Sequence, residues 1–277
     1  MDKIERLISF CGYGNFESAN IIFMGNEEGL GGGAIEDEIA KRTCKFWEEG
    51  KAIDVNEKAK GYYIDKQTYA DTRGPFLEFS SRLMKYLNSS EHTDYFKKNS
   101  EDPGTFRKIK EYKIYSLYHE RPDLNYRSAL VDYRPLPRAN ESLTYSIYDT
   151  LNERFDWKQY SRAFRFQVRN VDDYHLNLRN LRSDILKNVF TRDQETYAII
   201  GIGDKLTKRK FFETHFAFQE QFKGRSLSQA KDELFYGKIM INGNIIPIFL
   251  SDFFQSGRGI GLRGLEILAK IIKNEIY

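Results

Sequence analysis

The chain has 277 residues, a length that suits one large α/β domain or two smaller ones. With 40% hydrophobic and 30% charged residues the composition is globular, and a net charge of +3 excludes a histone-like polycation. Any nucleic-acid binding would therefore depend on a local basic face.

The two cysteines, Cys11 and Cys44, belong to no CxxC pair and no Cys/His cluster. This spacing argues against a structural zinc site or an iron–sulfur cluster, and we expect no metal and no cofactor. The amino-terminal pattern is too polar for a secretion signal, and no apolar run reaches the roughly 20 residues of a membrane span. We expect a cytoplasmic monomer with no membrane partner.

The most informative stretch is an apolar run at residues 21–24, which ends at Gly25 and continues through Asn26, Glu27 and Glu28 into a glycine-rich loop. A continuous apolar run of this length predicts a strand buried on both faces of a sheet. The polar residues would then lie just past its carboxyl end, where open α/β sheets bind their ligands. An ordinary loop with its glutamates in water is the alternative.

Three further short apolar runs predict strands at residues 129–132, 198–202 and 245–250. Helical segments separate these runs, so we expect a single α/β domain over residues 1–277: a three-layer α/β/α sandwich with a central, mostly parallel, four-stranded sheet. Pro247 in the last run suits a strand near an edge or at a bulge.

Apolar residues at helical spacing predict helices elsewhere in the chain, at residues 2–10, 34–47, 75–87, 176–189 and 262–273. Residues 48–71 and 88–121 are polar and lack periodicity, which indicates insertions into the domain.

Two segments carry clustered cations. Residues 158–169 alternate cations with rings, which fits either a nucleic-acid-facing surface or a strand with its rings inward, and we favour the strand. After the third strand, Lys205, Lys208 and Arg209 open a helix at the carboxyl edge of the sheet, where phosphates would be met. A merely solvated charge run is the alternative there.

The sequence GRGIGLRG in front of the last helix contains GxGxxG, the dinucleotide-binding pattern. That pattern needs a following strand with an acidic residue about 20 positions later, and no such strand follows. The glycines instead let backbone amides approach a phosphate or a base closely, with Ser251, Ser256 and Arg258 as further donors.

In element order and in two short motifs, the chain resembles the uracil-DNA glycosylase superfamily. In members of that superfamily the first strand ends in a water-activating motif such as GQDPY, GxNPG or GEAPG. In this chain, GNEEG at residues 25–29 lies at the matching place. Glu28 replaces the proline, Glu27 takes the Asp/Asn position, and Asn26 takes the acidic position of the GEAPG subgroup. The second motif, HPS with a loop that clamps the duplex, falls on residues 250–252 and lacks its histidine.

The resemblance implies a monofunctional DNA glycosylase that flips a modified or damaged base out of DNA and hydrolyses its N-glycosidic bond, leaving an abasic site. Glu27 would stabilise the developing sugar cation and orient a water, while Asn26 would position that water or contact the base. Candidates for the base pocket are Phe46, Trp47, Tyr62, Asp132 and Tyr133. Candidates for contacts to DNA are Lys205, Lys208, Arg209, Ser251, Ser256, Arg258 and Leu262, with Leu262 or Arg258 as the wedge.

Two other classes stay open. One is a non-catalytic nucleotide-binding α/β protein whose glycine loops cradle a phosphate, against which Glu27 and Glu28 argue because like charge repels an anion. The other is a defence or regulatory module that binds nucleic acid or protein without chemistry, which the missing histidine leaves open.

Overall fold

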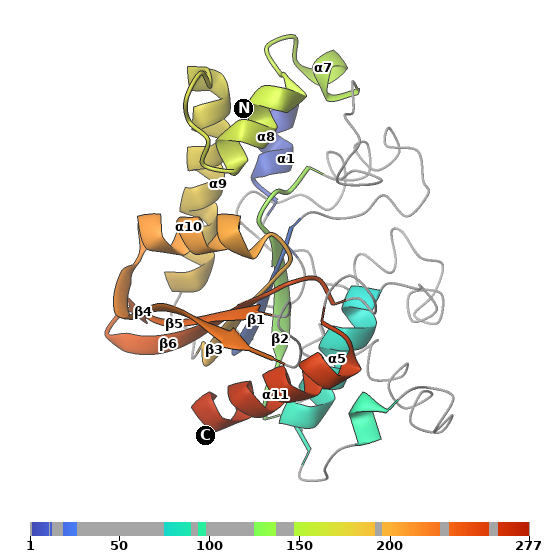
Figure 1. Cartoon of the computed structure of the whole chain (residues 1–277). Coiled ribbons are helices and arrows are strands. Elements are labelled where there is room, and N and C mark those ends of the chain that lie inside the picture. Colours follow the sequence, from blue (N-terminus) through green and yellow to red (C-terminus); the bar gives the residue numbers. More distant parts are fainter. Residues whose placement is uncertain are drawn as a thin grey trace.

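The computed structural model describes residues 2–10, 12, 19–26, 75–89, 94–97, 125–136, 147–191, 196–227, 233–254 and 260–276. These ranges form an α/β protein in which helices flank one sheet (Figure 1). The strands are β1 (Ile21–Gly25), β2 (Ser128–Asp132), β3 (Ala198–Ile202), β4 (Ala217–Ser226), β5 (Glu233–Ile241) and β6 (Asn244–Ser251). The helices are α1 (Lys3–Ile8), α5 (Pro75–Leu87), α7 (Ile147–Leu151), α8 (Trp157–Phe164), α9 (Asp173–Thr191), α10 (Lys205–His215) and α11 (Leu262–Ile276), with a 3-10 turn, η1, at Asp94–Phe96.

The strand order is β2-β1-β3-β6-β5-β4. β1 runs parallel to β2 and β3, and β3 runs parallel to β6, so the four predicted runs form the parallel part of the sheet. β5 and β4 extend the sheet by antiparallel pairing. The predicted α/β class is confirmed. The predicted four-stranded sheet is wrong, because the described sheet has six strands and is mixed.

A tight turn at Asn242 and Gly243 joins β5 to β6, and both residues have positive φ angles, 52° and 82°. This geometry follows the right-handed twist of the strands it joins, and Asn-Gly is its preferred sequence. β6 lies between β3 and β5, so the first of the two positions expected for the strand with Pro247, near an edge or at a bulge, is wrong. Pro247 is tolerated because it precedes the part of β6 that pairs with β3, which begins at Ile248.

β1, β2 and β3 are buried on both faces along their whole length, which explains their apolar sequences. Ile22, Met24 and Val131 face a cluster shared with α1, α8, α9 and α10. Ile21 and Phe23 face a second cluster shared with α5 and α11. Figure 1 shows these two groups of helices on opposite sides of the sheet.

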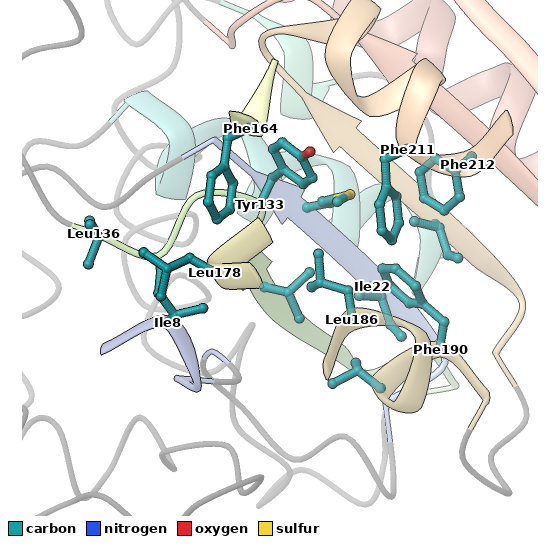
Figure 2. Close-up of a cluster of buried hydrophobic side chains, with 14 of the residues drawn as sticks. Ile8, Ile22, Tyr133, Leu136, Phe164, Leu178, Leu186, Phe190, Phe211 and Phe212 are labelled. Carbon is teal, nitrogen blue, oxygen red and sulfur yellow. The ribbon is translucent and has the colours of Figure 1, made fainter. Parts of the chain in front are cut away.

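Aromatic rings fill much of the first cluster. Figure 2 shows Phe164 from α8, Phe190 from α9, and Phe211 and Phe212 from α10 in the same buried cluster as Ile22 of β1. Aromatic residues make up 15% of the chain, and these rings show that part of them serves core packing.

Residues 158–169 are not a strand as predicted. Trp157 begins α8, where the side chain of Asp156 caps the first turn by accepting a hydrogen bond from the backbone N–H of Gln159. The buried residues of this helix, Trp157, Tyr160, Ala163 and Phe164, recur at helical spacing, and the cations between them face outward.

Other helix predictions are confirmed at α1, α5, α9 and α11. The predicted helix at 34–47 and the insertion at 48–71 lie outside the described residues, as does most of the insertion at 88–121. None of the described helices combines the length and the apolarity needed to cross a lipid bilayer.

Candidate functional site

The carboxyl ends of β2, β1, β3 and β6 share one edge of the sheet because these strands are parallel. The chain segments that follow β2 and β3 meet across the end of β1. The backbone N–H of Arg134 donates to the carbonyl oxygen of Asn26 at 2.6 Å, and the Arg134 guanidinium lies 3.5 Å from the carboxylate of Asp204. Asn26, the residue directly after β1, is thus enclosed by both neighbours.

The strand order diverges at this edge, because β2, the next described strand after β1, lies on one side of β1, whereas β3 lies on the other side and is followed by the strands beyond it. The next described helix after β1 is α5, which packs on one face, whereas β3 leads into α10 on the other face. Open α/β sheets bind ligands at such a divergence between neighbouring strands. The region around Asn26 and Gly203, at the neighbouring carboxyl ends of β1 and β3, is therefore the candidate site.

Lys208 ties this site together from α10. Its side chain is fully buried, and its ammonium group donates to Oδ1 of Asn26, to the carbonyl of Ile202 at 3.0 Å and to the carbonyl of Gly203 at 2.5 Å. Gly201 leaves room for the lysine stem, because a Cβ there would lie 3.0 Å from Cδ of Lys208. Three acceptor oxygens around one amine are the partners that a buried ammonium requires.

Gly203 brings an aromatic ring to the same place. Its φ is +71°, and a Cβ on it would lie 2.7 Å from the ring carbons of Phe253 and 3.0 Å from Nδ2 of Asn26. Only glycine fits between these two groups without strain. Phe253 follows β6 and is 41% exposed, so a large aromatic ring faces solvent beside the Asn26 amide.

A second buried cation supports the end of β2. The guanidinium of Arg182 on α9 is fully buried and donates to the carbonyl of Asp132 through two nitrogens, to Ile8 O at 3.2 Å and to Phe10 O. Arg182 therefore joins α9, on which it lies, to the end of β2 and to the end of α1.

Asp132 and Tyr133 were both predicted for a base pocket. Asp132 pairs in register with Gly25 and lies at the carboxyl edge as predicted, and its carboxylate lies against the Cα of Gly25. Tyr133 instead belongs to the core, where its ring packs against Phe164 and Phe211 (Figure 2). Burial raises the pKa of the Tyr133 phenol, and its hydroxyl has no hydrogen-bond partner among the described residues. We therefore correct its assignment from pocket to core.

The predicted basic face is also corrected. Lys208 is buried and cannot reach a phosphate. Lys205 is mostly buried and pairs with Asp252 at 2.8 Å, while Arg209 is more exposed and pairs with Glu213 at 2.7 Å. Both of these cations lie over the ring of Phe235. Protein groups thus engage all three cations.

The second predicted motif is partly buried. Ser251 is fully buried and its hydroxyl donates to the carbonyl of Asp252, so it is not placed to contact DNA. Leu262 begins α11 and packs against the cluster on that side of the sheet. Several predicted site residues lie outside the described ranges, namely Glu27, Phe46, Trp47, Tyr62, Ser256 and Arg258.

The sequence did not lead us to predict three residues of the site, namely Arg134, Asp204 and Phe253. Asp204 is the second residue after the third predicted strand, and Phe253 is the third residue after the fourth, so their positions alone were a usable signal. Asp204 has a left-handed backbone conformation, φ 37° and ψ 47°, at the start of α10 and makes no side-chain capping bond there. A strained non-glycine residue at such an edge is a further indication of a functional site.

The described side chains include no group of three or more His, Cys, Asp and Glu residues arranged to hold a metal ion. Comparisons with protein-family models, with curated proteins and with solved structures found no match to this chain.

Proposed function

We propose that this protein is a DNA glycosylase that holds a flipped, modified or damaged base at the carboxyl edge of its sheet and hydrolyses the N-glycosidic bond. The observation that carries the proposal is the fixed amide of Asn26 at the divergence of β1 and β3, beside the exposed ring of Phe253. Glu27 follows Asn26 directly in the sequence. The likeness to the uracil-DNA glycosylase fold is part of this proposal.

The reaction needs a carboxylate and hydrogen-bond donors. Water adds its oxygen to C1′ of the sugar, the bond from C1′ to the base nitrogen breaks, and the bonding electrons leave with the base. The proton from the water passes through the carboxylate and ends on the released base. Glu27 would stabilise the cationic sugar and take that proton, while the Asn26 amide would donate to the water or the departing base.

Phe253 suits the recognition of a flipped base. A base leaves the helical stack at a cost of a few kcal/mol, which stacking on an aromatic side chain offsets in part. Of the predicted cationic contacts to DNA, Lys205, Arg209 and Arg258 stay in the proposal, and Lys208 is removed from it because it is buried.

A non-catalytic nucleotide-binding protein is the second candidate. Two observations favour it: carboxylates pair with Lys205 and Arg209, and Lys208 is buried. The described part of this edge therefore has less cationic surface for a long phosphate backbone. A single base or nucleotide would need fewer such contacts.

One assay tests both candidates. The protein is incubated with labelled single-stranded and duplex oligonucleotides, each with one deaminated, oxidised or alkylated base. Released base is measured by chromatography, and abasic sites are measured by alkali cleavage. Release that depends on Glu27 supports the glycosylase. Binding of free nucleotides without release from any substrate would replace the glycosylase with the second candidate.

A further inference from the structure

We propose that the outer face of α8 and the loop that follows it form a contact surface for the phosphate backbone of DNA. Four cations make up this surface, which we call the α8 basic face: Lys158, Arg162, Arg165 and Arg169. The choice of DNA as the source of the phosphates rests on the proposed function. The arrangement of the cations is itself an observation of the structure.

The cations share one side of α8. Lys158, Arg162 and Arg165 follow one another at the spacing of one helix face, and all four cations are exposed. The opposite face carries the buried residues of this helix, namely Trp157, Tyr160, Ala163 and Phe164. The alternation of cations and rings at residues 158–169 therefore separates into an apolar face toward the core and a basic face toward solvent.

None of the four cations has an ion pair among the described residues, and residues 157–171 contain no Asp or Glu. Several cations elsewhere on the described surface do pair with a carboxylate one helical turn away. Arg209 pairs with Glu213 at 2.7 Å, and Lys270 pairs with Glu266 at 2.6 Å. The net charge of +3 for the whole chain therefore includes a local excess of positive charge on α8.

Helix stability does not account for Lys158. A cation is favourable near the carboxyl end of a helix but unfavourable in the first turn, where Lys158 lies. The nearest carboxylates along the chain, Asp156 and Asp172, cap α8 and α9. They accept hydrogen bonds from the backbone N–H groups of Gln159 at 2.8 Å and His175 at 2.9 Å. A cation at this position therefore suits an anionic partner outside the chain.

The backbone at the end of α8 is held in one conformation. The N–H of Gln167 donates to the carbonyl of Arg162 at 2.9 Å, and the N–H of Phe166 donates to the carbonyl of Ala163 at 3.0 Å. Phe166 has a φ of 56°, which residues other than glycine rarely adopt, and its ring packs under the guanidinium of Arg179 at 5.3 Å. The backbone that carries the cations therefore loses little freedom when a partner binds.

The α8 basic face borders the candidate site. Phe164, the last residue of α8, packs its ring against that of Tyr133 at a centroid distance of 5.9 Å (Figure 2). Tyr133 directly follows β2, and its backbone N–H donates to the carbonyl of Gly25 at the end of β1 at 3.0 Å. Since Arg165 follows Phe164 directly, the basic face begins beside the carboxyl edge of the sheet. DNA with one base at that edge would continue over α8.

The dimensions and the chemistry of this face fit a DNA strand. α8 rises by about 10 Å from Lys158 to Arg165, and one strand of a duplex carries about three phosphates over that length. Three of the four cations are arginines, whose guanidinium groups match phosphate oxygens in pairs. An anionic lipid surface fits less well, because helices that bind there insert an apolar face, and the apolar face of α8 is buried in the core.

The test neutralises the α8 basic face by changing all four cations to glutamine. Affinity for a labelled, unmodified duplex is measured by fluorescence anisotropy over a range of salt concentrations. We expect affinity at low salt to fall by about tenfold or more, and the slope of log affinity against log salt to shrink by about three. Unchanged affinity and slope would overturn the inference.

The matched control removes the same net charge from other parts of the surface, by changing to glutamine Lys3, Lys187, Lys223 and Lys270. Its affinity and salt slope should stay close to those of the wild type. Equal losses in the two variants would overturn the inference, because the net charge of the chain would then explain them.

Two further measurements keep the test decisive. Arg165 and Arg169 lie outside the helix, so the double variant Arg165→Gln with Arg169→Gln replaces the fourfold variant if circular dichroism shows that the latter does not fold. The salt slope should then shrink by about two, and an unchanged slope would overturn the inference. Binding to phosphatidylserine vesicles that depends on the four cations, without binding to DNA, would also overturn it.

Base release is measured in parallel. At saturating DNA, the single-turnover rate of the fourfold variant should equal that of the wild type, because these cations contact no reacting atom. DNA binding that depends on the α8 basic face, without release of any base, would contradict the glycosylase proposal and leave this inference standing. Base release by a fourfold variant that binds DNA as the wild type does would overturn this inference and leave the glycosylase proposal standing.

Discussion

Arg182 and Asp132 are 50 residues apart in the sequence, yet two nitrogens of the Arg182 guanidinium donate to the carbonyl oxygen of Asp132. The same guanidinium also donates to the carbonyls of Ile8 and Phe10. A buried cation thus connects three segments of the chain at the edge that carries the candidate site. Because the guanidinium is fully buried, bulk water cannot take over these bonds, and the cation is important for stability.

Substitution of Arg182 by methionine should therefore lower the free energy of unfolding by about 3 kcal/mol, since three buried carbonyls lose their donor. Urea denaturation followed by circular dichroism measures this change. Lys187→Met on the same helix removes a cation that is 41% exposed and should change stability by less than about 0.5 kcal/mol. Equal effects of the two substitutions would show that Arg182 is not the connecting group.

Gly203→Ala should destabilise the protein for two reasons, its positive φ and its contact with the ring of Phe253 at 2.7 Å. We expect a loss of about 2 kcal/mol. Gly243→Ala is the matched control, because its φ is +82° but nothing lies within 4 Å of the added Cβ, so it reports the backbone cost alone, about 1 kcal/mol.

The double variant Gly203→Ala with Phe253→Ala separates these two causes. Removal of the ring should restore the part of the stability that the collision costs, so the two substitutions should not be additive. Thermal unfolding of the four proteins in this cycle measures the coupling. Additive effects would mean that Phe253 does not lie against Gly203.

A cluster at the end of α11 should make stability depend on pH. Glu275 accepts hydrogen bonds from Tyr236 at 2.7 Å and pairs with Lys238 at 3.0 Å. Burial alone would raise the pKa of Glu275, but the hydrogen bonds from Tyr236 and Lys238 outweigh it and lower the pKa below its usual value. The folded state thus binds this proton more weakly than the unfolded state does.

The stability from this cluster is therefore fully present above the usual carboxyl pKa and is lost as pH falls through the lowered pKa. Glu275→Gln should cost about 1 kcal/mol at pH 7 and progressively less below about pH 4. Denaturant unfolding across this pH range measures the difference from the wild type. Asp184→Asn, which removes a highly exposed carboxylate, is the control for the loss of one negative charge.

Binding to DNA should depend on Arg209 and Arg258 but not directly on Lys208. Charge reversal of either arginine should weaken affinity for any sequence and reduce the slope of log affinity against log salt by about one. Lys223→Glu, at an exposed position on the edge strand β4, is the control. If affinity were unchanged in both arginine variants at low and high salt, DNA would have to bind to another surface of the protein.

The sequence predicted the four parallel strands because each is buried on both faces and must be apolar throughout, as at residues 21–24. It missed β4 because most of the side chains of that strand are exposed, and it missed β5, which is mostly buried, because Gly237 and Lys238 interrupt its apolar run. The dipeptide Asn242-Gly243 between two apolar segments was the signal that could have found the hairpin of β5 and β6.

The site could be predicted in position but not in chemistry. That Asn26, directly after β1, lies at the carboxyl edge followed from the parallel strands alone. The burial of Lys208 did not, because in the run DKLTKRK it looks like its neighbours Lys205 and Arg209. Its helical spacing to Phe211 and Phe212 places it on the apolar face of α10, and that spacing was the available signal.

The last prediction concerns Glu27, the residue on which the proposed chemistry depends most. If Glu27 orients the water and faces the sugar cation, Glu27→Gln keeps the shape but removes the charge that the transition state needs. Base release should then slow by orders of magnitude while DNA binding stays or tightens. Single-turnover release and fluorescence anisotropy measure the two quantities separately.

Two neighbours act as controls for this result. Asn26→Ala should cause a smaller but clear loss of rate, because the water or the base loses one contact while Glu27 remains. Glu28→Ala should retain most of the activity, since its carboxylate has no role in the proposed reaction. Circular dichroism checks that all three variants fold. If Glu27→Gln were fully active, or if Glu28→Ala were as slow as Glu27→Gln, the catalytic carboxylate would have to be assigned to another residue or the glycosylase proposal would be wrong.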